Sequence, residues 1–174
     1  WENAKARIPW LFASWVGGVL AAIIIGFFEH MLTNIIALAA FIPVIIGMGG
    51  NIGTQSSTII VRGIATGRIE LGNELKILFK EIQVGVILGS LYGFLLGLFA
   101  KYSFIEADPF LGVVVGLSIF CSMVIAAAVG AFTPLILRKL DIDPAIATGP
   151  FVTTSVDILG VLLYFIIAGK FLNM

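Results

Sequence analysis

The sequence is poor in charge. Only 11% of its 174 residues are Asp, Glu, Lys or Arg, whereas soluble domains carry about 25%. Hydrophobic residues make up 60% of the chain, and the mean hydropathy is +1.13. This composition excludes a soluble globular domain and indicates an integral membrane protein. The formal net charge of zero points to no particular partner, and we expect no nucleic-acid partner.

Cysteine and histidine are almost absent. Cys121 lies in an apolar run and has no second cysteine with which to form a disulfide or a metal pair, so we expect it to be a packing residue. With one histidine, the chain lacks the ligand cluster that zinc or copper favours. An enzyme is disfavoured because no second deep acid completes an aspartyl dyad and no deep histidine could activate a serine. A P-loop is also missing, since no Lys-Ser/Thr pair ends the glycine-rich stretch.

Long apolar runs dominate the rest of the chain. A helix needs about 20 residues to cross the hydrocarbon core, and five runs approach or exceed this length, at about residues 8–28, 35–64, 84–99, 111–137 and 146–172. The alternating ten-residue strands of a membrane barrel are absent. The sequence therefore predicts an all-α membrane protein, with five transmembrane helices in one pore domain, 1–174, surrounded by the lipid bilayer.

The segments between these runs are short. About residues 30–34 join the first two helices, and a polar linker at 68–83 follows the second. The second half of this linker is amphipathic, so we expect it to lead directly into the third helix; its apolar positions are Leu75, Leu78, Phe79 and Ile82. The chain begins at Trp1 and not at Met, so we interpret it as part of a longer protein.

Basic residues segregate to one side of a five-helix arrangement. That side holds Lys5, Arg7, Arg62, Arg68, Lys76, Lys80, Arg138 and Lys139, whereas the other side holds only Lys101 and Lys170. The positive-inside rule then predicts a cytoplasmic amino terminus and an extracytoplasmic carboxyl terminus in the cell membrane. Four or six crossings would lose this segregation.

Glycines recur every four residues in the third predicted helix, at Gly85, Gly89, Gly93 and Gly97. A shorter pair, Gly112 and Gly116, follows in the fourth. Small faces of this kind let neighbouring helix backbones approach closely. We expect these glycines to pack helices and to take no part in chemistry.

The second predicted helix contains a polar stretch at 43–58. One helical stripe would hold Gly47, Asn51, Thr54, Thr58 and Arg62, and it is widened by Gly50 and Gln55. Glycine exposes backbone carbonyls, and hard cations or their water shells bind oxygen. The alternative interpretation is that these small and polar residues only pack and form hydrogen bonds within the bundle.

The fifth predicted helix repeats this geometry. One face would hold Gly149, Thr153, Asp157, Gly160 and Tyr164. The opposite faces would hold Phe151, Ile158, Leu162, Phe165 and Ile166. A carboxylate deep in a span costs about 2.5 kcal/mol or more, so it usually faces a water-filled cavity or a partner. Asp157 is the only acid that we expect at such depth, and no Lys or Arg is expected there. A cation from solution is therefore the better partner.

The candidate lining is made of oxygen donors alone. Magnesium suits such a site because it keeps several of its waters and touches only one or two carboxylates. A two-fold dimer with both Asp157 side chains near its axis would supply two carboxylates, so we expect a homodimer. Glu29, at the outer end of the first helix, is either an interfacial cap or part of an acidic mouth that concentrates cations. Cobalt, manganese and calcium remain alternatives to magnesium.

Two long motifs resemble a known family. They are PVIIGMGGNIGTQSSTIIVR at 43–62 and DPAIATGPFVTTSVDILG at 143–160, and Pro9-Trp10-Leu11 and Phe28-Glu29 fit as well. Over essentially its whole length, the chain resembles the transmembrane domain of the MgtE family of magnesium transporters. The resemblance implies five helices per subunit, a homodimer and a cation pore lined by the second and fifth helices. It also implies cytosolic regulatory domains that would precede Trp1.

The resemblance also implies roles for individual residues. Asp157 matches the family's pore aspartate, which holds a largely hydrated magnesium ion, and Gly50 and Asn51 match the stretch beside it. The predicted ion-binding set is Asp157, Gly50, Asn51, Gly149 and Thr153, and the predicted pore lining is Gly47, Thr54, Gln55 and Thr58. The chain departs from the family pattern at Gly149 and Thr54, where members often have Asn. These two positions are expected to bear on ion selectivity or affinity.

The sequence thus predicts a channel or transporter that moves hydrated Mg²⁺ into the cytoplasm down its electrochemical gradient. No ATP-binding motif is present, so that gradient is the expected driving force. The alternative is a proton- or sodium-coupled secondary transporter in which Asp157 is the coupling site. A membrane scaffold that transports nothing is a third possibility.

Overall fold

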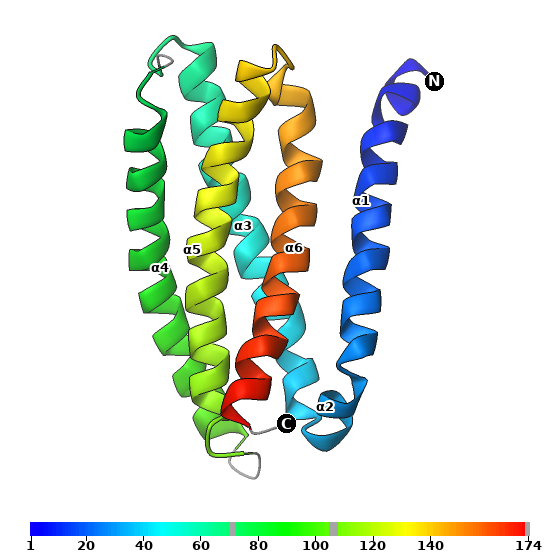
Figure 1. The fold of residues 1–174 in the computed structure, drawn as a ribbon, viewed down its shortest axis with the longest axis vertical. Helices are drawn as coiled ribbons and strands as arrows, with labels where there is room; N and C mark the ends of the chain where they lie inside the picture. The colour runs from blue at the N-terminus through cyan, green and yellow to red at the C-terminus, as the bar shows by residue number, and fades with distance from the viewer. Residues whose placement is uncertain (70–71, 105–107, 173–174) are drawn as a thin grey trace.

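The structure, a computed structural model, describes residues 1–69, 72–104 and 108–172, and these residues form six helices (Figure 1). In chain order they are α1 (Glu2–Phe27), α2 (Glu29–Asn34), α3 (Ala37–Ala65), α4 (Glu74–Ser103), α5 (Leu111–Lys139) and α6 (Pro144–Phe171). The described residues contain no strand. A helix satisfies its backbone hydrogen bonds within one segment, which is what the hydrocarbon core demands of a crossing chain.

Five of the helices in the described part of the chain are long and apolar enough to cross a membrane. These candidate spans are Arg7–Phe27, Ala37–Ala65, Glu74–Ser103, Leu111–Lys139 and Thr148–Phe171. The prediction of an all-α membrane protein with five spanning helices is therefore confirmed.

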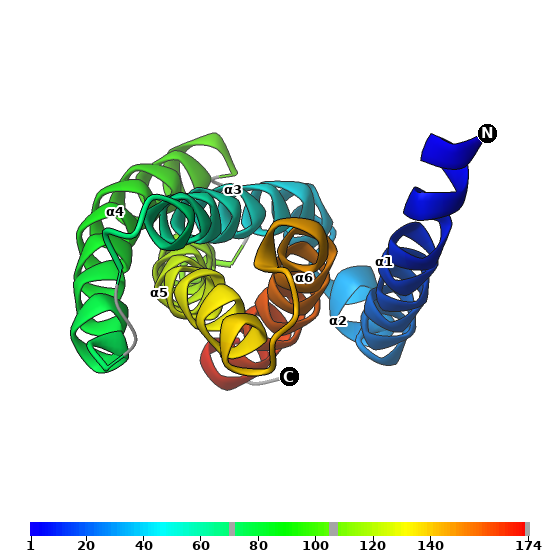
Figure 2. The same cartoon turned by 90° about the horizontal axis from the view of Figure 1, so that it is seen from above.

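Helices α3, α5 and α6 pack together, α4 lies along α5, and α1 lies at the edge of the bundle against α6 (Figure 2). Val115 and Ile119 of α5 are fully buried. The Tyr164 hydroxyl of α6 donates a hydrogen bond to the Leu38 carbonyl of α3 at 2.9 Å. α5 therefore forms the centre of the bundle, and α3 and α6 are fixed against it and against each other.

The first connecting segment differs from the sequence prediction, whereas the second leads directly into the third span, as predicted. The short link after the first span forms helix α2, because Glu29–Asn34 closes one further helical turn before α3 begins. The polar linker ends at Asn73, and α4 runs without a break through the amphipathic half into the apolar half. Glu81 therefore lies two turns inside a spanning helix instead of in a linker, so Asp157 is not the only acid within a candidate span.

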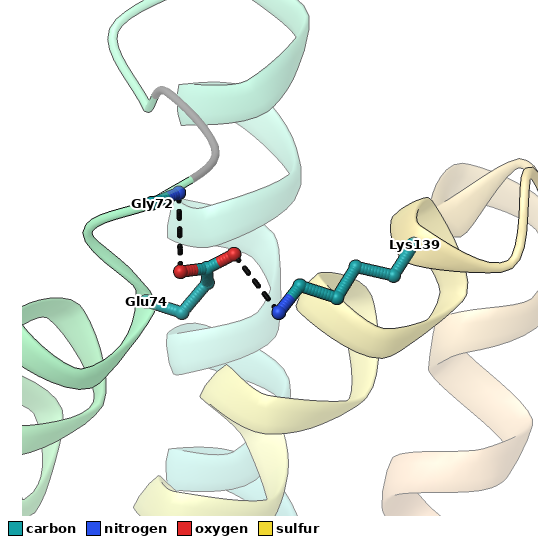
Figure 3. A network of polar contacts seen from close by, with 3 residues as sticks. All are labelled: Gly72, Glu74 and Lys139. Atoms are coloured by element: carbon teal, nitrogen blue, oxygen red, sulfur yellow. Dashed lines mark hydrogen bonds and ion pairs between the residues drawn. The ribbon is translucent and has the colours of Figure 1, made fainter.

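The start of α4 is joined to the end of α5 by polar contacts (Figure 3). Glu74 Oε1 lies 3.1 Å from Lys139 Nζ, and Glu74 Oε2 accepts a hydrogen bond from the Gly72 backbone N–H at 3.1 Å. Lys139 is 59% exposed, and a surface pair of this kind contributes only about 0–1 kcal/mol. The contact therefore adds little to the stability of the fold.

The glycines of α4 and α5 face one another, as the sequence predicts. A Cβ added to Gly93 would lie 2.6 Å from the Gly116 carbonyl oxygen, and one added to Gly97 would lie 2.7 Å from the Gly112 carbonyl oxygen. Real Cβ atoms do not approach backbone oxygens so closely. The two helix backbones are therefore in direct contact, which only glycine permits.

The two ends of the bundle differ in charge. The amino ends of α1, α4 and α6 and the carboxyl ends of α3 and α5 lie together at one end (Figure 1). The larger set of basic residues belongs to these helix ends and their loops, whereas Lys101 and Lys170 belong to the last turns of α4 and α6 at the opposite end.

Candidate ion-binding site

The polar stretch of the second span is a continuous helix within α3. Its open side is exposed in the single chain and consists of Gly47, Asn51, Thr54, Gln55 and Thr58. Its other side is buried and includes Gly49, Ile52, Gly53, Ser56 and Ile60. The helical period of 3.6 residues separates these two sets. The open set carries glycine, amide and hydroxyl groups, and the exposed Val44 and Arg62 lie on the same side toward the two ends of α3.

The threonine hydroxyls of this open side bond to their own helix. Thr54 Oγ1 donates to the Gly50 carbonyl at 2.7 Å, and Thr58 Oγ1 donates to the Thr54 carbonyl at 2.8 Å. Each hydroxyl has one proton and two acceptor lone pairs. Each hydroxyl proton is donated to a backbone carbonyl. The oxygen lone pairs therefore remain available as acceptors, which suits a cation or its water shell.

Asp157 of α6 lies beside this open side. A Cβ added to Gly50 would lie 3.9 Å from Asp157 Oδ1, which is ordinary contact distance. The Asp157 side chain is half-buried, and its carboxylate has no hydrogen bond or ion pair among the residues that the structure describes. An unpaired carboxylate within a span is costly, so this position favours water and a cation as partners.

The first turns of α6 extend the same side. Thr153 Oγ1 lies 3.1 Å from the Gly149 carbonyl oxygen and 3.3 Å from that of Pro150, and donates to them. Gly149 is exposed, with no atom within 4 Å of an added Cβ. Pro150 has no N–H, so the carbonyl one turn earlier loses its helical donor. Gly149, Thr153 and Asp157 therefore follow one another, a turn apart, along a partly open side rich in oxygen.

The rest of the predicted face of α6 is not open. Gly160 and Tyr164 are buried: Gly160 packs near Ser122 of α5, and the Tyr164 hydroxyl is bonded to Leu38. The spacing of these residues is helical, as predicted. They are covered because α3 and α5 close over α6 toward its carboxyl end.

Close packing behind the site fixes the spacing of α3 and α6. A Cβ added to Gly49 would lie 2.7 Å from Ser122 Oγ and 2.9 Å from Val156 Cγ1, and one added to Gly53 would lie 2.9 Å from Val152 Cγ1. Val152 and Val156 are fully buried. Because Gly49 and Gly53 have no side chains, Val152 and Val156 pack directly on the α3 backbone, which keeps α3 and α6 close together beside Gly50 and Asp157.

Glu29, the predicted outer-mouth residue, is not brought to Asp157. It is the exposed first residue of α2. Its neighbour Phe28 stacks on Phe165 with ring centroids 4.7 Å apart, and Phe165 lies about 12 Å beyond Asp157 along α6, at about 1.5 Å per residue. Glu29 therefore belongs to the end of the bundle opposite the larger basic set.

Sequence reasoning missed two polar side chains near the site. Ser56 Oγ of α3 donates to Glu81 Oε2 of α4 at 2.7 Å, on the buried side of α3. Ser122 Oγ, behind Gly49 and Gly160, is buried without a hydrogen-bond partner in the described structure. The only sign of these two serines in the sequence is that each is a polar residue within an apolar helix. That sign does not identify which residue the serine hydroxyl contacts.

The described residues contain no group of three or more His, Cys, Asp and Glu side chains that could hold a metal ion. One chain thus presents a single carboxylate among neutral oxygen donors. This arrangement suits transient binding of a hydrated ion, because an ion that must leave again cannot be bound tightly.

A bundle of five apolar helices, with one open oxygen-rich side and a carboxylate beside it, has the features of an α-helical ion-transport protein. The chain belongs to the MgtE family: the family model described as divalent cation transporter matches residues 42–167. The matched range includes α3 from Ile42 onward, all of α4 and α5, and most of α6. Members of this family are transporters, which agrees with the sequence prediction that the chain is not an enzyme.

Similar proteins carry the name magnesium transporter MgtE. The one from Bacillus subtilis is 36% identical over 170 residues, which cover 98% of this chain and 37% of the relative. The one from Thermus thermophilus is 37% identical over 163 residues, which cover 94% of this chain and 36% of the relative. The one from Enterococcus faecalis is 34% identical over 172 residues. The chain therefore spans less than two fifths of the length of each of the first two relatives.

Proposed function

We propose that the protein conducts divalent cations, with Mg²⁺ as the principal ion, between the open side of α3 and Asp157 of α6. The position of Asp157 carries the proposal: a Cβ added to Gly50 would lie 3.9 Å from its Oδ1, and its carboxylate has no described protein partner. The proposed ion-binding residues are Asp157, Gly50, Asn51, Gly149 and Thr153. The proposed lining adds Gly47, Thr54, Gln55 and Thr58.

The donor set favours a hard ion. Mg²⁺ holds its inner waters strongly and binds through one or two carboxylates, so a hydrated ion could contact Asp157 directly or through water, and the carbonyl and hydroxyl oxygens through water. The relatives named magnesium transporters support magnesium as the principal ion. Gly149 and Thr54 bear on discrimination among divalent ions, because both lie on the open side.

The proposed pore is completed by a second copy of the chain. The open side of α3 is exposed in one chain, and polar groups of this kind do not face lipid in a membrane bundle. A two-fold homodimer would place the same side of its partner opposite and bring a second Asp157 to the axis. Two carboxylates would then balance one divalent ion.

Transport is proposed to run into the cytoplasm across the cell membrane. The end with the larger basic set is assigned to the cytoplasm, which leaves the amino terminus inside and the carboxyl terminus outside. A divalent ion gains about 4.6 kcal/mol per 100 mV, at about 2.3 kcal/mol per charge. The membrane potential is therefore sufficient as a driving force.

A secondary transporter coupled to protons or sodium is the second candidate. A half-buried carboxylate such as Asp157 is also the group that proton relays use within membranes. This candidate predicts flux that requires a pH or sodium gradient, whereas a channel needs only the ion gradient and the potential.

The test is Mg²⁺ influx into liposomes that contain the purified protein, under an inside-negative potential. Asp157→Asn keeps the shape of the side chain and removes its charge, so we expect influx to fall about tenfold or more. Asp141→Asn is the matched control, because Asp141 is exposed and has φ +56°, a conformation that Asn tolerates. Parent-like influx in Asp157→Asn would overturn the pore assignment, and influx that requires a proton or sodium gradient would favour the coupled transporter.

A further inference from the structure

A groove lies along the α4–α5 pair, away from the candidate ion-binding site. Its volume is about 470 Å³, and its lining includes Phe94, Leu98 and Lys101 of α4 and Val113 and Leu117 of α5. Phe94 is 67% exposed and Val113 is 49% exposed. In a membrane-spanning helix pair, such side chains meet the hydrocarbon of the bilayer.

The groove exists because the two helices meet through glycine. Gly93 and Gly97 are in backbone contact with Gly116 and Gly112. These glycines are already occupied by helix packing, so they are not the binding groups themselves. Their close approach leaves a crevice beside the contact, and larger apolar side chains form its rims.

The groove has a basic end. Lys101 lies in the last turn of α4, and a Cβ added to Gly112 would lie 2.9 Å from Lys101 Cβ, so the lysine stem lies over the first turn of α5. Lys101 is exposed and forms no ion pair with any described carboxylate. Asp108, in the adjoining loop, has its Oδ1 engaged by the Phe110 backbone N–H at 2.8 Å. The amino end of α5 adds partial positive charge.

We propose that this groove binds a phospholipid with an anionic headgroup. One acyl chain lies along the apolar crevice, and the headgroup phosphate meets Lys101 and the first turn of α5. From Gly89 to Lys101, α4 rises about 18 Å at about 1.5 Å per residue, close to half of the roughly 30 Å hydrocarbon core. The groove thus matches one leaflet, which is the extracytoplasmic leaflet in the proposed orientation, and Lys101 extends its charged end to the level of the headgroups.

The bound lipid would bridge α4 and α5 at the end opposite the Glu74–Lys139 contact. The lipid would therefore support the helix pair where the described structure has no side-chain ion pair between these helices. The proposal is independent of ion transport, because the groove shares no residue with the open side of α3.

The experiment is native mass spectrometry of the purified protein with added phosphatidylglycerol or phosphatidylcholine. We expect the parent to retain phosphatidylglycerol preferentially, and Lys101→Gln to retain about fivefold less. Lys170→Gln is the matched control, since Lys170 is exposed in the last turn of α6, at the same end but outside the groove. Val113→Trp fills the groove from an exposed position and should lose the lipid although Lys101 is intact.

The same variants define the outcomes that would overturn the proposal. Equal retention of phosphatidylglycerol by parent and Lys101→Gln would mean that Lys101 does not bind the headgroup. Retention by Val113→Trp, with an unchanged melting temperature in lipid-free detergent, would mean that no acyl chain occupies the groove. A change of oligomeric state in Val113→Trp would mean that a second copy covers the groove instead. If Val113→Trp unfolds, Leu117→Trp, on the same rim, serves as the groove-filling variant.

Discussion

Two glycine-rich regions of this protein have opposite surroundings. On α4 and α5, glycines face glycines, and the backbones touch, as at Gly93 and Gly116. On the open sides of α3 and α6, Gly47 and Gly149 have no atom within 4 Å of an added Cβ. Both regions repeat glycine at helical spacing. On α4 and α5 the glycines allow the two helix backbones to touch, whereas on α3 and α6 they leave a polar side without bulky side chains. Spacing alone therefore does not reveal what a membrane glycine does.

The largest expected effect on stability follows from Gly93→Ala. The new Cβ would lie 2.6 Å from the Gly116 carbonyl oxygen, so the two helices must separate. We expect a loss of about 1–3 kcal/mol in the free energy of unfolding, measured as a lower melting temperature in detergent. An unchanged melting temperature would mean that the α4–α5 contact is looser than described.

The hydrogen bond between Ser56 and Glu81 joins the two regions, because it links α3 to α4. Ser56→Ala leaves the half-buried Glu81 carboxylate without this donor, so we expect a loss of about 1–2 kcal/mol. Ser57→Ala is the control, since the Ser57 hydroxyl bonds to the Thr54 carbonyl of its own helix at 3.2 Å, and it should change stability by about 0.5 kcal/mol or less. Equal melting temperatures for the two variants would contradict a stabilising link.

The smallest effect is expected for Gly47→Ala. An added Cβ meets no atom in the single chain, and Ala is favoured over Gly inside a helix by up to about 1 kcal/mol. The melting temperature should therefore stay the same or rise slightly, in contrast to Gly93→Ala. A fall as large as that of Gly93→Ala would show that the open side of α3 is tightly covered in the assembled protein.

Periodicity predicted much of this arrangement. Apolar runs of helical length are sufficient to predict five spanning helices, because the bilayer permits little else. The 3.6-residue period also predicted which residues of α3 share the open side, from Gly47 to Thr58.

Contacts between distant segments could not be predicted in this way. The Ser56–Glu81 hydrogen bond joins residues 25 positions apart. The burial of Gly160 and Tyr164 depends on how α3 and α5 cross α6. The proximity of Gly50 and Asp157 was expected only through the family resemblance, since neither helix specifies its neighbour by spacing alone.

Cysteine accessibility along α3 tests the central claim most directly. Thr54→Cys, made in a Cys121→Ser background, places a thiol on the open side of α3, and Leu98→Cys places one on the exposed, lipid-facing side of α4. A thiol needs water to ionise and react, so we expect a membrane-impermeant thiol reagent to modify Thr54→Cys about tenfold faster. Mg²⁺ should slow that reaction, and Asp157→Asn should abolish the protection. A Thr54→Cys thiol that is unreactive, or that reacts equally with and without Mg²⁺, would contradict an ion pathway between α3 and Asp157.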